Sequence, residues 1–159
     1  MTSRNKVMFT VITVIKNCDI SDFNLTKASL LKQDFPYWEW IVKDCSCMGD
    51  QLGLPNDRRV KYLNRPDLNI YDAMNQAVDI ACGDYVLFIN AGDYIYDKST
   101  LYKISNEITG KGISFWYGNV RKSFTFRKIE KYPKKLSRFY LFGHTICHQG
   151  WVIDRNMLV

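Results

Sequence analysis

The chain has 159 residues and a mass of 18.6 kDa, the size of one domain, so we expect a single domain over residues 1–159. Hydrophobic residues make up 47% and aromatic residues 14%, which excludes a mainly disordered chain because there is enough apolar surface to form a core. The net charge is +6, the longest apolar runs are too short to span a membrane, and residues 1–6 lack a secretory signal pattern, so we expect a cytoplasmic protein.

In chain order the sequence predicts an alternation of strands and helices. We expect strands at residues 7–15, 38–43, 60–63, 85–89, 113–120 and 151–153, helices at about 22–33, 69–81 and 99–108, and a hairpin arm over 123–131. Ser21 or Asp22 is expected to cap the first helix, and residues 44–56 are expected to form a loop. This alternation predicts an α/β fold with a mostly parallel sheet flanked by helices.

The positive charge is concentrated in one segment. Between Arg121 and Arg138 there are eight basic residues and one acidic residue, Glu130. Such a segment suits a phosphate-bearing substrate, an anionic membrane surface or nucleic acid, and it also suits a solvated face without a partner. The five cysteines are an odd number without a secretory signal, which indicates reduced thiols rather than a disulfide framework.

Polar residues follow three of the predicted strands directly. They are Lys16 and Asn17 after the first strand, Asp44 after the second, and residues 90–93 after the fourth. In parallel α/β sheets, ligands bind beyond the carboxyl ends of the strands. The sequence therefore predicts a binding site at one edge of the sheet.

The residue types at this edge allow more than one role. Asp93, beside Gly92, suits a hard divalent cation, yet an aspartate after a strand is also common in plain turns. Asp44 suits hydrogen bonding to a base or ribose, with the same turn alternative. Asp72 and Asn75 lie three apart near a helix start, where they can contact a ligand or take part in capping.

Several motifs occur in a defined order along the sequence. They are Arg65-Pro66-Asp67, the run NIYDAMN at 69–75, ACGDY at 81–85 and FINAGD at 88–93, with ITV at 12–14, Asn17, EWIV at 39–42 and His148-Gln149. This set resembles family-2 glycosyltransferases, closest to the branch that builds colanic-acid-type and other bacterial surface polysaccharides. The resemblance implies a Rossmann-like GT-A fold and inverting transfer of a sugar from a nucleotide-diphosphate sugar, a UDP-sugar or GDP-sugar, to a saccharide or lipid-linked acceptor. It also implies a Mn²⁺ or Mg²⁺ cofactor.

The same resemblance implies residue roles. Asp44 would contact the nucleotide base, and Asp72 and Asn75 would line the donor pocket. Asn90 and Asp93 would occupy the acidic DxD motif of the fold, with Asp93 as the metal ligand. Thr13 and Asn17 would lie beside the nucleotide, and His148 and Gln149 near the sugar or acceptor.

The sequence departs from the family pattern in four places. Lys16 replaces a usual aromatic residue, residues 45–51 replace a glycine-rich stretch, and Asn69 replaces a common glycine. Family members also continue past the His-Gln motif to an acidic general base, whereas this sequence ends at Val159. We therefore expect a C-terminally truncated domain, with a donor part over about 7–120 and the start of an acceptor part over 121–159, and His148 as the candidate base.

Two other functions compete with an active transferase. One is a catalytically inactive remnant that binds a nucleotide sugar or a protein partner. The other is a nucleic-acid-binding domain, which the absence of a recognised motif disfavours. We further expect a peripheral contact of Arg121–Arg138 with the inner membrane face, and self-association through an uncovered sheet edge or apolar face.

Overall fold

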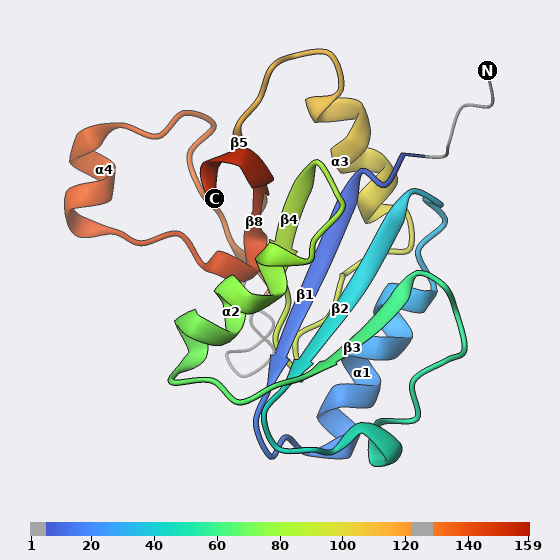
Figure 1. The fold of residues 1–159 in the computed structure, drawn as a ribbon. Helices are drawn as coiled ribbons and strands as arrows, with labels where there is room; N and C mark the ends of the chain where they lie inside the picture. Colours follow the sequence, from blue (N-terminus) through green and yellow to red (C-terminus); the bar gives the residue numbers. More distant parts are fainter. Residues whose placement is uncertain (1–5, 122–128) are drawn as a thin grey trace.

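The computed structural model describes residues 6–121 and 129–159, and its centre is a six-stranded sheet in the order β3-β2-β1-β4-β8-β5 (Figure 1). Four neighbouring strands are parallel: β1 (Phe9–Ile15), β2 (Trp38–Asp44), β3 (Val60–Asn64) and β4 (Tyr85–Phe88). The predicted α/β fold with a mostly parallel sheet is therefore confirmed.

The end of the sheet beyond β4 is antiparallel. Strand β8 (Trp151–Asp154) lies between β4 and β5 (Phe115–Tyr117) and is antiparallel to both. The single strand predicted over 113–120 is wrong: β5 ends at Tyr117, and β6 (Val120–Arg121) pairs instead with β7 (Ile129–Glu130). Most of the predicted hairpin arm over 123–131 lies outside the described residues.

Helices cover both faces of the sheet. Helices α1 (Ile20–Leu31) and α3 (Thr100–Ile108) lie on one face, α2 (Ile70–Asp79) lies on the other, and α4 (Arg138–Gly143) stands apart from the sheet (Figure 1). The described residues also form three short 3-10 helices, η1 (Gly49–Leu52), η2 (His148–Gly150) and η3 (Arg155–Met157). Within the described ranges, none of the helices has the length and apolar character needed to cross a membrane.

The core is split by the sheet into two clusters, because successive side chains of a strand face opposite sides. Val11 of β1 belongs to the cluster that contains Phe23 of α1 and Leu101 of α3. Its neighbour Ile12 belongs to the cluster that contains Ala77 of α2. Burial on both faces explains why the first strand is an almost uninterrupted apolar run in the sequence.

Side-chain caps determine where α1 and α2 begin near the edge of the sheet. The Asp19 carboxylate accepts the Ser21 N–H at 2.6 Å, so α1 begins earlier than the predicted caps Ser21 and Asp22 allow. Asn69 caps α2, since its Oδ1 accepts the N–H groups of Tyr71 at 2.9 Å and Asp72 at 3.1 Å. The asparagine at position 69 is therefore an effective helix cap in place of glycine.

Candidate functional site

Loops that follow β1 and β2 meet at the carboxyl edge of the parallel strands. In the register of the sheet, Ile15 pairs with Asp44, so these two strands end side by side. The Asn17 N–H donates to Ser46 Oγ at 2.9 Å, which joins the two loops. Asn17 adopts a φ of 49°, a left-handed conformation that asparagine tolerates better than most residues. Its side chain is exposed at the predicted edge.

The fully buried Asp44 side chain organises the loop after β2. Its Oδ1 accepts the Ser46 N–H at 2.6 Å and the Ser46 hydroxyl at 2.7 Å. Its Oδ2 accepts the Met48 N–H at 2.6 Å and the Tyr62 hydroxyl at 2.7 Å. Both carboxylate oxygens thus hold the backbone of residues 46–48 in place at the edge.

These contacts also set the charge state of the pair. Burial raises the pKa of the Asp44 carboxyl, but the hydrogen bonds from Ser46, Tyr62 and Met48 outweigh it and hold the pKa below its usual range. Burial, together with the hydrogen bond that it donates to Asp44, raises the pKa of Tyr62 to about 12. At neutral pH the site therefore contains a carboxylate and a neutral phenol.

Thr13 lies in the core and its side chain does not reach the edge. It is fully buried, and its Oγ1 accepts the indole N–H of Trp40 at 2.9 Å. The hydroxyl satisfies a buried tryptophan donor that would otherwise lose its hydrogen bond to water. The structure therefore places Thr13 behind the site, as a support between β1 and β2.

Asp72 and Asn75 both lie on α2, but in different settings. Asp72 Oδ2 accepts the Leu68 N–H at 2.9 Å and an amide N–H of Gln76 at 3.1 Å, so this carboxylate holds the loop before the helix. Asn75 is exposed. The sequence left open a capping role for Asp72 and Asn75. In the structure Asn69 is the residue that caps α2, and Asp72 accepts the Leu68 N–H of the preceding turn.

A buried ion pair fixes the same loop to the sheet. Lys43 of β2 is fully buried, and its Nζ lies 2.7 Å from Asp67 Oδ2, a side chain that is 7% exposed. The same Nζ donates to the Arg65 carbonyl oxygen at 2.6 Å. The motif residues 65–67 are thereby held against the end of β2, and this sets the start of α2.

The turn after β4 is held by helix α1. Gly92 adopts a φ of 92°, a conformation that favours glycine, and it lies directly before Asp93. The buried Thr26 hydroxyl of α1 lies 2.6 Å from the Asp93 carbonyl oxygen and 3.1 Å from both the Asn90 carbonyl oxygen and the Gly92 nitrogen. These contacts fix the backbone of the turn that contains Asp93.

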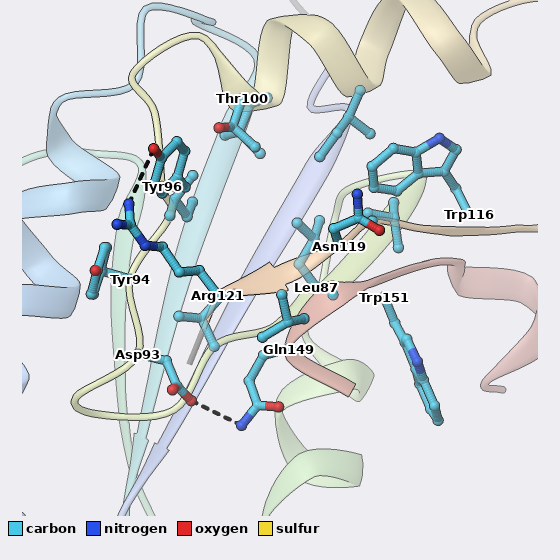
Figure 2. Close-up of a pocket in the computed structure, with 18 of the residues that line it drawn as sticks. Leu87, Asp93, Tyr94, Tyr96, Thr100, Trp116, Asn119, Arg121, Gln149 and Trp151 are labelled. Atoms are coloured by element: carbon cyan, nitrogen blue, oxygen red, sulfur yellow. Dashed lines mark hydrogen bonds between the residues drawn. The ribbon is translucent and has the colours of Figure 1, made fainter. Parts of the chain in front are cut away.

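The predicted His148 and Gln149 lie directly against this turn. Gln149 Nε2 donates to Asp93 Oδ2 at 3.1 Å, as Figure 2 shows. His148 Nε2 lies 3.3 Å from Asn90 Nδ2, so a ring nitrogen without a proton accepts the amide N–H. The structure thus brings together two pairs of predicted site residues, and the pairs are more than fifty positions apart in the sequence.

A cavity of about 190 Å³ opens beside Asp93 and Gln149 (Figure 2). Its walls are mostly apolar and come from β4, α3 and the C-terminal strands, with Trp116 on one side. Arg121 and Tyr96 lie on the opposite side, where Arg121 Nη1 donates to the Tyr96 hydroxyl at 3.2 Å. A ring-sized group can therefore lie in the cavity next to a carboxylate and an amide.

The side chains at the site suit a metal ion whose remaining ligands come from a substrate. Among residues 6–121 and 129–159, no three or more His, Cys, Asp and Glu side chains gather as a complete metal cage. Mg²⁺ and similar ions often use one or two carboxylates and complete their shell with substrate phosphates and water. Asp93, half-buried at the edge and fixed by Gln149, matches such a one-carboxylate site.

Sequence reasoning missed three residues that shape the site. Thr26 falls within the helix expected at about 22–33, and a threonine among buried positions is the available signal. Lys43 was treated as part of a strand, although a lysine inside an apolar strand already requires a partner. Tyr62 left no local signal, because its contact with Asp44 joins two strands.

Comparison with known proteins gives matches over most of the chain. The family described as Glycosyl transferase family 2 matches residues 10–154. The PGL/p-HBAD biosynthesis glycosyltransferases of Mycobacterium tuberculosis and Mycobacterium bovis are 39% identical over 137 residues, covering 81% of this chain and 52% of those proteins. The chain therefore spans about half the length of these relatives.

Solved structures share the fold. Staphylococcus aureus TarS, residues 1–349, matches with a TM-score of 0.63 and 22% identity over 95% of this chain and 48% of that one. The mannosyltransferase PcManGT from Pyrobaculum calidifontis, in complex with GDP-Man and Mn²⁺, matches with a TM-score of 0.70 and 15% identity over 94% of this chain and 45% of that one. TarS has also been solved with UDP-GlcNAc.

Proposed function

The chain belongs to glycosyltransferase family 2, and from this premise we propose that it transfers a sugar from a nucleotide-diphosphate sugar to a saccharide or lipid-linked acceptor, with inversion, in surface polysaccharide biosynthesis. One observation supports the proposal above all others. The Asn90–Asp93 turn, His148 and Gln149 form one constellation at the carboxyl edge of the sheet, beside the loops after β1 and β2.

In this proposal the edge binds the donor. Asn17 and the loop held by Asp44 lie beside the nucleotide, so Asp44 acts on the base pocket through the backbone of residues 46–48. Asp72 and Asn75 on α2 line the donor side, and Thr13 supports the strand below. Solved neighbours with UDP-GlcNAc and with GDP-Man make both nucleotides the first donors to test.

Asp93 would hold Mn²⁺ or Mg²⁺, as one carboxylate of a shell that the donor's phosphates complete. When bound, the ion would neutralise the diphosphate leaving group. Gln149 restrains the carboxylate in this role through its hydrogen bond to Oδ2. The Thr26 contacts keep the turn in place without using the side chain of Asp93.

His148 is the proposed base. Inverting transfer requires a group that takes the proton of the acceptor hydroxyl as this oxygen attacks the sugar. The amide N–H of Asn90 favours the His148 tautomer in which Nε2 has no proton and uses its lone pair to accept this N–H. In the proposed reaction, the hydroxyl of the sugar acceptor replaces the Asn90 amide as the hydrogen-bond donor to Nε2. His148 can then accept the proton of this hydroxyl.

The donor site is tested by calorimetric titration of UDP and of GDP, each with and without Mn²⁺. We expect Mn²⁺-dependent binding of one nucleotide, and a loss of at least about tenfold in affinity for Asp93→Ala. Asp79→Ala, an exposed acidic residue at the end of α2, is the matched control and should bind as the unaltered protein does. Absence of binding by a folded chain would refute the donor site.

The competing function, binding of a nucleotide sugar without turnover, uses the same site. Release of the free nucleotide from UDP-GlcNAc and GDP-Man separates the two. We expect His148→Ala to retain nucleotide affinity and to lose turnover, because the base acts after binding. Binding without release of nucleotide in the unaltered chain would favour the binding-only function.

We also propose a peripheral position at the inner membrane face, where a lipid-linked acceptor would be found. The basic stretch from Arg121 to Arg138 supports this position through charge. Of its residues, 122–128 lie outside the described part, and Arg121 is engaged with Tyr96. The remaining basic residues, Lys131, Lys134, Lys135 and Arg138, precede α4 or begin it.

A further inference from the structure

Helix α4 exposes large apolar side chains to an unusual degree. Phe139 and Phe142 are each 91% exposed, and Leu141 is 52% exposed. No residue of α4 is buried, and the helix stands away from the sheet on two connecting segments (Figure 1). Single exposed apolar residues are common, but two exposed phenylalanines on one short element indicate a surface that meets another phase or molecule.

The two phenylalanines form one apolar edge on an ordered helix. They are three residues apart, which makes them neighbours on a helix surface. The helix is fixed from within: Ser137 Oγ accepts the Tyr140 N–H at 3.1 Å, and Tyr140 stacks on His144 with ring centroids 4.6 Å apart. Tyr140 is therefore held toward His144, and the Phe139–Phe142 edge is left to solvent.

Four basic residues precede this edge in the sequence. The four basic residues of the described stretch before and within α4 are all exposed: Lys131, Lys134, Lys135 and Arg138. Exposed aromatic residues flanked by lysine and arginine suit an anionic lipid surface, because the rings enter the boundary of headgroups and acyl chains while the cations meet the headgroups. A second copy of the chain would bring like charges together at the same surface.

We propose that residues 131–142 dock this protein on an anionic lipid surface, with Phe139 and Phe142 inserted and the four basic residues at the headgroups. This inference rests on the proposed function at the membrane and deepens it. The sequence suggested a contact through charge alone, whereas the structure adds the exposed aromatic edge of Phe139 and Phe142. Membrane affinity would then require both the aromatic edge and the cations.

The test is co-sedimentation of the full chain with vesicles of phosphatidylcholine alone and of phosphatidylcholine mixed with phosphatidylglycerol. We expect binding only to the mixed vesicles. Phe139→Ser combined with Phe142→Ser should weaken it by at least about tenfold, since two buried rings are lost. Tyr102→Ser, an exposed aromatic residue on α3, is the matched control and should leave binding unchanged.

The charge contribution is measured separately. Lys134→Gln with Lys135→Gln should weaken binding to the mixed vesicles and reduce its sensitivity to salt. Nucleotide titration of the same variants should be unchanged, so a failure of the lipid contact is distinguishable from a failure of the donor site.

Three results would overturn the lipid contact itself. One is an absence of vesicle binding by the folded chain, and another is full binding by the double serine variant. The third is self-association in sedimentation velocity that the serine variant abolishes while no vesicle binding occurs, because the apolar edge would then belong to a second copy. Equal binding to both vesicle types would refute the anionic specificity.

Discussion

The region from β1 through α3 and the region from residue 113 onward are stabilised in different ways. In the first, β1 and β2 are buried on both faces, and the buried charged side chains Glu39, Lys43 and Asp44 all have hydrogen-bonding partners. In the second, the buried hydrophobic residues within the described part are Ile146, Val152 and Ile153. The carboxyl edge of the parallel strands thus lies against a closely packed core, and the second region, which has few buried residues, contributes His148 and Gln149 to the candidate site.

The candidate site therefore joins residues from a closely packed region to residues from a region with few buried side chains. The Asp44 and Asp93 loops are each fixed by several internal hydrogen bonds. His148 and Gln149 reach the same site through single side-chain contacts to Asn90 and Asp93. Substitutions should therefore be costly in the first region and mild in the second.

The largest expected effect is at the buried ion pair. Lys43→Met leaves the Asp67 carboxylate buried without its cation, and we expect a loss of about 3–5 kcal/mol in the free energy of unfolding. Adding Asp67→Asn should recover part of it, because the unpaired charge is removed. Urea denaturation measures both. The matched control, Lys134→Met in the exposed second region, should change stability by less than about 0.5 kcal/mol; equal losses for both lysines would contradict the comparison.

A pair of glycines gives the next largest contrast. A Cβ at Gly83 would lie 2.5 Å from the Thr10 nitrogen and 2.7 Å from the Phe9 carbonyl carbon, both backbone atoms, so Gly83→Ala should cost about 1–3 kcal/mol. A Cβ at Gly143 meets nothing within 4 Å, and Gly143→Ala at the end of α4 should be neutral or stabilising by up to about 1 kcal/mol. Thermal unfolding of both variants measures the difference. A destabilised Gly143→Ala would show that α4 is packed more closely than its exposure indicates.

The smallest expected effect concerns pH and the Tyr62–Asp44 contact. The folded pKa of Asp44 is depressed, so this carboxyl stabilises the fold above its unfolded pKa of about 3.9, and that contribution is lost as the pH falls through the folded value. The folded pKa of Tyr62 is raised to about 12, so its contribution is present below the unfolded pKa of about 10 and is lost as the pH rises toward 12.

Tyr62→Phe tests both limbs of this pH profile. Near neutral pH we expect a loss of about 1 kcal/mol from the missing hydrogen bond. Acid unfolding should begin at higher pH because Asp44 loses a donor, and the alkaline decline should become shallower because no phenol ionises at this position. The control is Tyr102→Phe on the exposed side of α3, which should leave both limbs unchanged in denaturation curves recorded from acid to alkaline pH.

Local sequence patterns were enough to predict the parallel half of the fold and the sheet edge at which the candidate site residues gather. Apolar runs such as the one around Val11 and Ile12, and the helical stripe of α2, are local patterns of burial, so they are visible without the fold. The polar residues after each strand, including Asp44 and Asp93, follow from the rule that parallel strands end at one edge. The ordered motifs between residues 65 and 93 were enough to indicate the family.

Only the tertiary structure decided how the remaining residues meet. The insertion of β8 between β4 and β5 brings His148 and Gln149 to the Asn90–Asp93 turn, and no local pattern encodes a contact over more than fifty residues. The internal bonding of Asp44, the core position of Thr13 and the pairing of Lys43 with Asp67 also depend on neighbouring strands and loops. The physical reason is that periodicity and caps act within a few residues, whereas hydrogen-bond partners and burial are set by elements that meet only in the folded chain.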